Sequence, residues 1–398
     1  MGYRKRDTNG LGLMLDPSEL PDIRRRVKER AEADRGILDA LRAEVRPLKT
    51  SVRQIMPRSA TAMSLVASDG GNNQIQFDPF MMEVVRVVDS YGEQLCLDVV
   101  SPTTDTDQLS DAQFDAAGQP VTKLGYMMSA LGKRKLYDLS PMIPRPRPGE
   151  DPTAVNPSWV QVYRDLCEWA VLHERICRTE FPSDTLIVRD GLLRSKIFHG
   201  TLFIKLRDRL EDGIEQARVK RKRRLCLVGM AKSSKVLARY RLAMTIEDVL
   251  TQSFPCYVRI PREIEAKAYV WPEYARGRQE EEEKPGEEPK FVAGVLYLVK
   301  FGRAPGDPIW ALDLLESQVA DEAIVLGHLL ADAIDGFPVP FYPRCLQKAH
   351  ENAALVDFDM NILADEIFKA IRGALPAGKP DALDVLRLHG DPSSQRYE

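Results

Sequence analysis

Paired cysteines and long apolar runs are both missing from this 398-residue chain. Its six cysteines form no CxxC pair and no spacing typical of a zinc site or a disulfide framework. No run of 18 or more apolar residues occurs, and the basic residues at the start precede no apolar signal segment. These absences argue against a disulfide-stapled secreted protein and against a membrane-spanning helix. We therefore expect a cytoplasmic protein with no membrane partner.

The net charge of -3 is small and by itself predicts neither a nucleic-acid nor a membrane partner. The 44% of hydrophobic residues are ordinary for a globular protein, and the chain is long enough for a large core. Cations are nevertheless clustered at 132–139, 145–148 and 219–224. Such clusters suit phosphate binding with a steep salt dependence, and Tyr137 beside the first would suit base stacking. The 219–224 cluster directly precedes an apolar strand and is more typical of a solvated face.

Helix formers dominate residues 17–46, where an intermittent apolar stripe predicts one long helix or two. This extension is equally consistent with a helix packed on its own domain and with a dimerisation arm. Beyond residue 62 the apolar runs become short and rich in β-branched residues, which is typical of strands. We expect four strands here, in the runs AMSLVASD, NQIQF, MEVVRVVDS and EQLCLDVVS.

A polar, proline-rich connection at 102–157 separates these strands from a segment in which helices and strands alternate. The expected elements are a helix at about 157–178, a strand at 184–190, a helix at about 200–218 and a strand at 224–230. A strand meander followed by alternating helices and strands predicts an α/β fold with a mixed sheet.

The last third of the chain begins with an acidic tract at 278–289, which is typical of an exposed loop. Strands are expected in FVAGVLYLVKF and PIWALDLL, and helices at about 317–335, 343–355 and 359–373. The chain then divides into three parts. They are a helical extension at 1–58, a main domain at 59–375 with insertions at about 102–157 and 276–290, and a tail at 376–398.

Two apolar strands end on an aspartate followed by glycine: SLVASDGGN around Asp69 and TLIVRDGLL around Asp190. A single Asp-Gly pair is more often only a turn. Two of them after matched strands indicate acids that emerge at one end of a sheet, where glycine lets another group approach closely. If the strands are neighbours, the carboxylates repel each other unless a proton or a divalent cation lies between them.

The helix between these strands supplies two further acids. Glu174 lies on the same helical face as Tyr163 and Cys167, which we expect to pack on the sheet, whereas Glu168 shares a polar face with Arg164. An acid on the sheet-facing side is costly unless it is paired or binds a metal. Glu174 is therefore the preferred ligand candidate, and Glu168 is the alternative.

Acids at the end of the first strand, on the following helix and at the end of a later strand form the layout of a ribonuclease H-like metal nuclease. Three such carboxylates can hold one or two Mg²⁺ or Mn²⁺ ions. Ions in that position activate water and neutralise charge on the phosphate under attack. The sequence therefore predicts a metal-dependent phosphodiester hydrolase.

Several separated motifs, in the expected order, resemble the NurA family of DNA-end-processing nucleases. They are SDGG around Asp69, the helical Glu174, VRDGLL around Asp190, GMAKSSK after a strand, and FYPRCLQKAHENAAL, in which Tyr342 and His350 are eight residues apart as in the family pattern. The resemblance covers about residues 60–370 and implies a ribonuclease H-like sheet flanked by helices. It also implies that Asp69, Glu174 and Asp190 are metal ligands and that His350 is a catalytic or metal-binding residue.

The same resemblance implies roles for two further side chains. Lys232, in GMAKSSK, would place its ammonium group near the scissile phosphate, and Tyr342 would orient a ligand or stack on a base. The family further implies a homodimer and Mn²⁺- or Mg²⁺-dependent hydrolysis of DNA. Its partner would be a hexameric HerA-type ATPase that translocates duplex DNA, in repair or in antiphage defence.

Two other functions are compatible with the sequence. A catalytically idle scaffold could keep the fold and the ATPase interface, although the acids at all three expected places disfavour it. A phosphotransferase of the actin and sugar-kinase type also ends its first strand on Asp-Gly. The stretch AIVLGHLLADAIDGFPVPF lacks the glycines that such an enzyme needs in its second phosphate loop.

Overall fold

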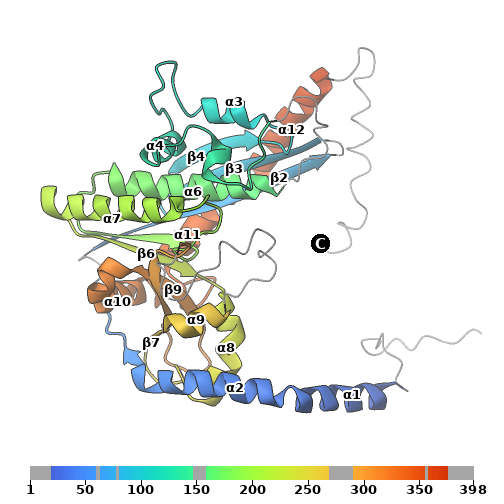
Figure 1. The fold of residues 1–398 in the computed structure, drawn as a ribbon, viewed down its shortest axis with the longest axis vertical. Helices are drawn as coiled ribbons and strands as arrows, with labels where there is room; N and C mark the ends of the chain where they lie inside the picture. The colour runs from blue at the N-terminus through green and yellow to red at the C-terminus, as the bar shows by residue number, and fades with distance from the viewer. Residues whose placement is uncertain are drawn as a thin grey trace, which may run out of the picture.

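A mixed nine-stranded sheet forms the centre of the part of the chain that the computed structural model describes, which is residues 19–59, 63–77, 80–146, 158–268, 290–354 and 357–374 (Figure 1). The strand order is β1-β7-β8-β9-β6-β5-β2-β3-β4. Only the pairs β2/β5 and β5/β6 are parallel. The strands are β1 (Arg53–Gln54), β2 (Ser64–Phe77), β3 (Phe80–Asp89), β4 (Gln94–Val100), β5 (Thr185–Asp190), β6 (Leu225–Ala231), β7 (Cys256–Arg259), β8 (Gly294–Lys300) and β9 (Ile309–Leu315). The predicted α/β fold with a mixed sheet is confirmed.

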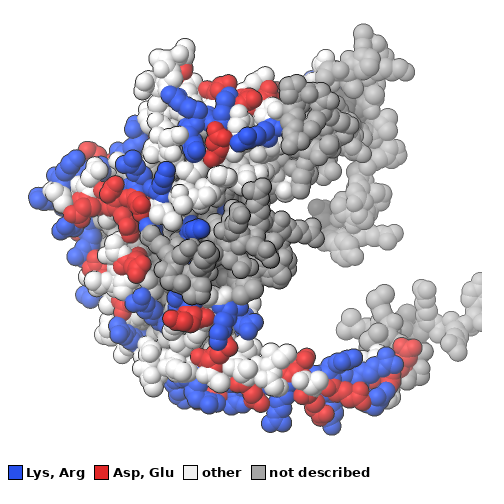
Figure 2. All heavy atoms as spheres, viewed as in Figure 1, with Lys and Arg blue, Asp and Glu red and all other residues white. Residues whose placement is uncertain are grey.

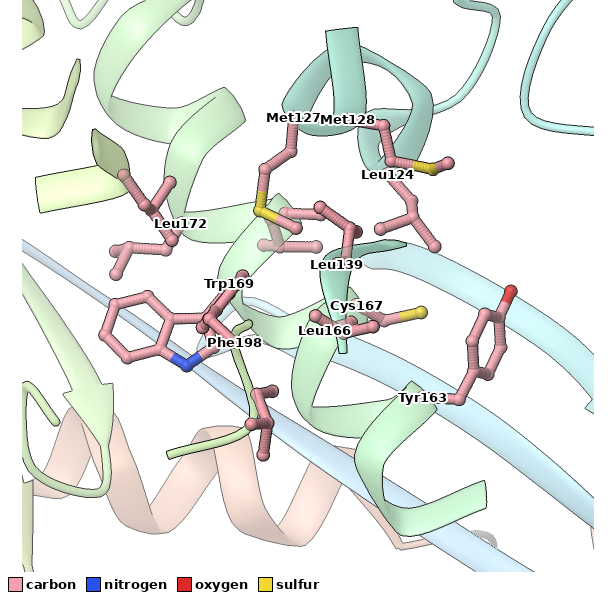
Figure 3. Close-up of a cluster of buried hydrophobic side chains, with 14 of the residues drawn as sticks. Leu124, Met127, Met128, Leu139, Tyr163, Leu166, Cys167, Trp169, Leu172 and Phe198 are labelled. Carbon is pink, nitrogen blue, oxygen red and sulfur yellow. The ribbon is translucent and has the colours of Figure 1, made fainter. Parts of the chain in front are cut away.

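One face of the sheet is covered by α6 (Trp159–Cys177) and α7 (Leu202–Lys220). Helix α6 is apolar on most of its circumference because it lies between the sheet and a further helical layer. Figure 3 shows Tyr163, Leu166 and Cys167 of α6 grouped with Met127 and Met128 of α4 (Lys123–Ala130). Each fully buried side chain of this kind contributes about 1.5–3 kcal/mol to folding. The sheet and both helical layers therefore share one core.

The polar, proline-rich connection at 102–157, for which no helix was predicted, contains helices in its described part. It contains α3 (Thr106–Asp111), α4 and α5 (Leu136–Leu139). Asp105 accepts hydrogen bonds from backbone N–H groups at the start of α3, and Thr122 does so for α4, so both helices begin at a side-chain cap. These short helices were missed because turn residues separate their apolar positions.

The opposite face of the sheet packs against α10 (Glu322–Ala333) and α11 (Arg344–Ala353). Helix α11 lies across β2 and β3, and its buried residues include Ala349 and Ala353, whose small side chains let the helix approach the strands closely. A 3₁₀ helix, Glu316–Asp321, precedes α10, so the single helix expected at 317–335 is two elements. Helix α12 (Asp357–Ala374) follows α11 and buries a small cluster around Ile367 and Phe368.

The remaining strands are covered by α2 (Arg35–Val45) and α8 (Lys235–Ile246), with α9 (Arg262–Ala268) beside them. Helix α8 was not predicted; Ser234 caps it by accepting a hydrogen bond from the Leu237 N–H group. None of the described helices is both long enough and apolar enough to cross a membrane. The acidic tract at 278–289 and the tail from 376 lie outside the described residues.

Of the two predicted alternatives for the N-terminal extension, one long helix or two, the structure has two helices. Helix α1 (Leu20–Ala33) has no buried residue and extends beyond the body of the molecule, whereas α2 packs its apolar side on α8 (Figure 1). Figure 2 shows cations and anions mixed along α1. One example is Arg25, which pairs with Asp22 and with Glu29. Of the two helices, α2 therefore attaches the extension to the rest of the protein, and α1 does not.

Candidate metal centre

The two predicted strand-end acids lie next to each other. The parallel pairing of β2 and β5 ends at the pair Ser68 and Arg189, so Asp69 and Asp190 are the next residue on each strand. Asp190 ends β5 as expected. Asp69 does not end β2, however, because the strand continues to Phe77 and pairs with β3 through the two glycines. The Asp-Gly-Gly stretch is thus a point where β2 leaves its parallel neighbour, and not a turn.

A third residue, His350 of α11, completes the cluster. Its Nδ1 lies 2.8 Å from Oδ2 of Asp69. One ligand atom each from Asp69, Asp190 and His350 lies within 4.8 Å of the other two. The Asp69 side chain is 12% exposed and that of His350 is 64% exposed, so the cluster opens to solvent on the histidine side. Three residues from separate parts of the chain therefore converge on one small, accessible volume.

Two more of the predicted residues contact Asp190. The hydroxyl of Tyr342 points to Oδ1 of Asp190 at 3.5 Å, and Nζ of Lys232 lies 3.9 Å from Oδ2. Lys232 also lies 5.3 Å from the centre of the Tyr342 ring. Tyr342 is fully buried against Trp310, so it is part of the wall of the site and is not free to stack on a base. Lys232 is partly exposed and can reach a bound group.

Electrostatics in the cluster follow from burial and from the paired acids. Burial raises the pKa of Asp190, and the nearby charge of Asp69 raises it further, while Lys232 lowers it. Burial and the charge of Asp190 also raise the pKa of the Tyr342 phenol. The phenol is therefore protonated at neutral pH and available as a hydrogen-bond donor. A second positive charge near Asp190 would relieve the repulsion between the two carboxylates.

The helical acid next to the cluster is Glu168, not the preferred candidate Glu174. Glu168 is 13% exposed, and its carboxylate lies against Gly70, the residue after Asp69. Arg189 donates a hydrogen bond to Oε2 of Glu168 at 3.1 Å. Burial raises the pKa of Glu168 to about 8, although the charge of Arg189 opposes that rise. Glu168 thus borders Asp69 from the other side of β2.

Glu174 is turned elsewhere. It pairs with Arg178 at 2.9 Å, and the Arg178 guanidinium stacks on the ring of Tyr126 in α4 at 3.6 Å. Six residues of helix separate Glu174 from Glu168, a rise of about 9 Å. The face expected to pack on the sheet does so at its start, where the Tyr163 hydroxyl donates to Oδ2 of Asp98 in β4 at 2.6 Å, but at Glu174 it faces α4. The polar face also packs on the sheet and is satisfied there by ion pairs such as Arg175 with Asp89 at 2.6 Å.

Arg189 is a residue of the site that the sequence reasoning missed. Its guanidinium lies over the ring of Trp169 at 4.6 Å and also donates to the carbonyl of Leu192 at 3.1 Å. A cation inside an otherwise apolar strand, directly before the predicted ligand Asp190, was the available signal. Gly191, at φ +100°, leaves the space that this guanidinium occupies.

The glycines after Asp69 are explained by the two helices on either side of β2. A Cβ on Gly70 would lie 2.3 Å from Oε1 of Glu168, on the α6 side. A Cβ on Gly71 would lie 2.6 Å from the carbonyl oxygen of Ala353, on the α11 side. Both distances are below any ordinary carbon contact, so each glycine admits one helix to the strand that carries Asp69.

The side chains present fit a divalent cation. Two carboxylates and one imidazole are ligands that suit Mn²⁺, and carboxylates suit Mg²⁺. Burial raises the pKa of Asp190 and the charge of Asp69 adds to that rise, and a cation between the two carboxylates would offset their repulsion. Among the described residues, Asp69, Asp190 and His350 form a cluster whose ligand atoms are close enough together to bind one ion. Asp69, Asp190 and His350 are the residues that would hold it.

The cation cluster at 132–139 is largely engaged within the protein. Lys135 pairs with Asp107 at 2.9 Å and with Asp111 at 2.8 Å, and the hydroxyl of Tyr137 donates to Asp107. Arg145 of the next cluster lies over the Tyr137 ring at 5.0 Å. The aromatic side chain expected to stack on a base is therefore occupied by an arginine.

Comparison with known proteins gave matches among solved structures only. No family model matches the chain, and no curated protein matches it. The crystal structure of the NurA nuclease from Sulfolobus solfataricus is similar with a TM-score of 0.42 and 11% identity, covering 89% of this chain and 98% of that one. A NurA structure with manganese gives 0.38 and 13%, covering 89% and 99%. One bound to dAMP and manganese gives 0.37 and 14%, covering 93% and 100%. These solved structures, to which the chain is similar, are of NurA proteins, the family whose motifs the sequence resembles.

Proposed function

We propose that this protein is a divalent-metal-dependent nuclease that hydrolyses phosphodiester bonds in DNA. The observation that carries the proposal is the convergence of Asp69, Asp190 and His350, whose ligand atoms lie within 4.8 Å of one another at the open end of the β2/β5 pair. Carboxylate ligands with the partly exposed ammonium group of Lys232 beside them suit a phosphate-cleaving metal site. Mn²⁺ or Mg²⁺ is the proposed ion.

In this proposal the chain's own residues have distinct tasks. Asp69, Asp190 and His350 hold the metal, which would lower the pKa of a water molecule and offset charge on the phosphate. Lys232 offers its ammonium group to a non-bridging phosphate oxygen from its place 3.9 Å from Asp190. The hydroxyl group of Tyr342 donates a long hydrogen bond to Asp190 and so helps to keep the Asp190 side chain in one rotamer. Glu174 remains a candidate by resemblance only, because Glu168 is the helical acid that borders the cluster.

The partners belong to the same proposal and rest on the motif resemblance. They are DNA, a second copy of the chain and a hexameric HerA-type ATPase, in DNA-end repair or antiphage defence. Co-purification of the two proteins, followed by native mass measurement, tests both the homodimer and the ATPase complex. Recovery of the chain as a monomer that never binds the ATPase would remove this part and leave the nuclease proposal intact.

The decisive experiment measures Mn²⁺-dependent cleavage of labelled single- and double-stranded DNA by wild type, Asp69→Asn and Asp190→Asn, with the ATPase present and absent. Loss of metal-dependent stabilisation commonly costs several kcal/mol of transition-state energy, so we expect rates at least 100-fold lower in both variants. Asp208→Asn is the matched control, because Asp208 is an exposed acid on α7 that pairs only with its neighbour Arg207 in the described structure. Undiminished cleavage by Asp190→Asn would sink the assignment.

The same samples separate an enzyme from an idle scaffold. Calorimetric titration with Mn²⁺ should show binding to wild type and to the Asp208→Asn control and no binding to Asp190→Asn. A wild-type protein that binds the ATPase but neither binds Mn²⁺ nor cleaves DNA would support the scaffold instead.

A further inference from the structure

A cavity of about 570 Å³ lies on the other side of α11 from His350. Its walls are the start of β2, the turn between β3 and β4, and the facing sides of α10 and α11, two helices that lie on one face of the sheet (Figure 1). The volume is within the range of ligand-binding pockets, about 300–1,000 Å³. No residue assigned to the metal centre lines it.

Two cations project from α11 into this cavity. Arg344 and Lys348 are exposed, line the cavity, and are four residues apart, so they lie on one side of the helix. Neither has an ion-pair or side-chain hydrogen-bond partner among the described residues. Lys135 and Arg25, in contrast, are each paired with two acids. Two unpaired cations at this spacing form a site for an anion with several acceptor oxygens.

The other polar groups of the cavity are compatible with an anion. Its one carboxylate, Asp332, accepts a hydrogen bond from the Cys345 N–H group at 2.9 Å and so serves the start of α11. Ser64 and Ser90 add hydroxyl groups to the wall, and Tyr91, which is 75% exposed, forms part of its rim. An exposed aromatic ring beside a phosphate site suits a nucleotide base, which can stack on it.

Helix geometry fixes how this cavity relates to the metal centre. Lys348 and His350 are two residues apart, so their side chains leave α11 on opposite sides. A helix with its side chains is about 10–12 Å across. A phosphate held by Arg344 and Lys348 is therefore too far from Asp69 to be the one that is cleaved.

We infer that this cavity binds a phosphate of the nucleic-acid strand away from the scissile bond, with Arg344 and Lys348 as its ligands. The inference rests on the proposed function and extends it: the cavity positions a strand longer than a dinucleotide, and the metal centre cleaves it. Substrates too short to reach across α11 gain nothing from the cavity.

The test compares Arg344→Ala/Lys348→Ala with Lys205→Ala/Arg209→Ala. The control removes two exposed cations with the same spacing from α7, which packs on the other face of the sheet. Binding of a fluorescent 12-nucleotide single strand is measured against salt concentration, with Asp190→Asn in every sample to prevent cleavage. Each neutralised phosphate contributes about 0.7 to the slope of log K on log salt for single strands, so the cavity variant, which loses one phosphate site, should lose about 0.7. Its affinity at 0.1 M salt should fall roughly fivefold, and the control should keep the parent slope.

A second measurement, with native Asp190, separates this inference from the proposed function. Hydrolysis of bis(p-nitrophenyl) phosphate in Mn²⁺ should be equal in wild type and the cavity variant, because this small phosphodiester cannot span α11. A salt slope equal to that of the control would overturn the inference, and so would loss of bis(p-nitrophenyl) phosphate hydrolysis in the cavity variant alone. Absence of hydrolysis in the wild type would instead count against the proposed function, while the salt slopes would still decide the inference.

Discussion

Replacing Gly71 by alanine should damage the metal centre through the position of a helix, without touching a ligand. The added Cβ would lie 2.6 Å from the Ala353 carbonyl oxygen and 3.2 Å from its carbonyl carbon. These are backbone atoms at the end of α11, so no side chain can rotate away. The end of α11 must move away from β2 by about 0.8 Å, from 2.6 Å to about 3.4 Å, to reach an ordinary contact distance. His350 lies three residues from Ala353 and would move with it.

The magnitude follows from two effects. Overpacking a close-packed contact costs about 1–3 kcal/mol of unfolding free energy, reduced by up to about 1 kcal/mol because alanine loses less backbone entropy than glycine. The contact between His350 and Asp69, 2.8 Å in the native structure, would also lengthen. Disturbing the support of a metal ligand typically lowers metal affinity 10- to 100-fold. We therefore expect a modest loss of stability together with a large loss of Mn²⁺ affinity.

Urea unfolding without metal and calorimetric titration with Mn²⁺ measure the two effects separately. Gly36→Ala is the matched control, since a Cβ at Gly36 in α2 meets no atom within 4 Å. That variant should be more stable than wild type by about 0.5–1 kcal/mol and should bind Mn²⁺ normally. If Gly71→Ala is as stable as wild type and binds Mn²⁺ equally well, α11 does not pack on β2 at this point and the account of the site is wrong.

Two further predictions concern α6. Glu168→Gln should slow DNA cleavage at least tenfold, because Glu168 lies against Gly70, the residue after Asp69. Glu174→Gln should stay within about threefold of the wild-type rate, because Glu174 pairs with Arg178 away from the site. If a side-by-side cleavage assay gives the reverse order, Glu174 is the better ligand candidate, as the sequence predicted. His173 is buried, and burial lowers its pKa to about 4 from an ordinary 6.5. Between these two pH values His173 is protonated in the unfolded chain and neutral in the folded protein. Stability should therefore fall as pH drops below about 6.5, by about 2 kcal/mol at pH 5, and His173→Gln should remove that part of the loss; equal pH slopes for the two proteins in urea unfolding would contradict it.

Periodicity and turn chemistry predicted the elements that pack most regularly. The expected strand at 184–190 is β5, and the expected helix at about 157–178 is α6. The closeness of Asp69 and Asp190 followed from the same reasoning, because parallel neighbours bring equivalent positions to one end of a sheet. His350 and Tyr342 could not be found this way, since α11 reaches Asp69 across 281 residues of chain and only the motif resemblance pointed to it.

The position of Glu174 away from Asp69 and Asp190 has a physical origin. Glu174 was preferred because the apolar stripe of an amphipathic helix normally faces the sheet. Helix α6 instead has a core on its outer side, supplied by Met127 and Met128 of α4, and ion pairs on its sheet side. A helix that packs between two layers exposes little of its surface to water, so neither of its two packed faces has to be the polar one. The sequence pattern of α6 therefore could not indicate which acid faces the strands.

The stretch from Asp69 to Gly71 links the fold to the chemistry more closely than its sequence suggested. Successive residues of a strand face opposite sides of the sheet, so Gly70 admits Glu168 from α6 and Gly71 admits the end of α11. The carboxylate of Asp69 therefore contacts His350 only when α11 packs on β2, and Glu168 comes close to Gly70 only when α6 packs on the same strand. Packing of both helical layers on β2 is thus a condition for assembling the site. Core variants that loosen either helix should lower Mn²⁺ affinity along with stability, even where they lie far from any ligand.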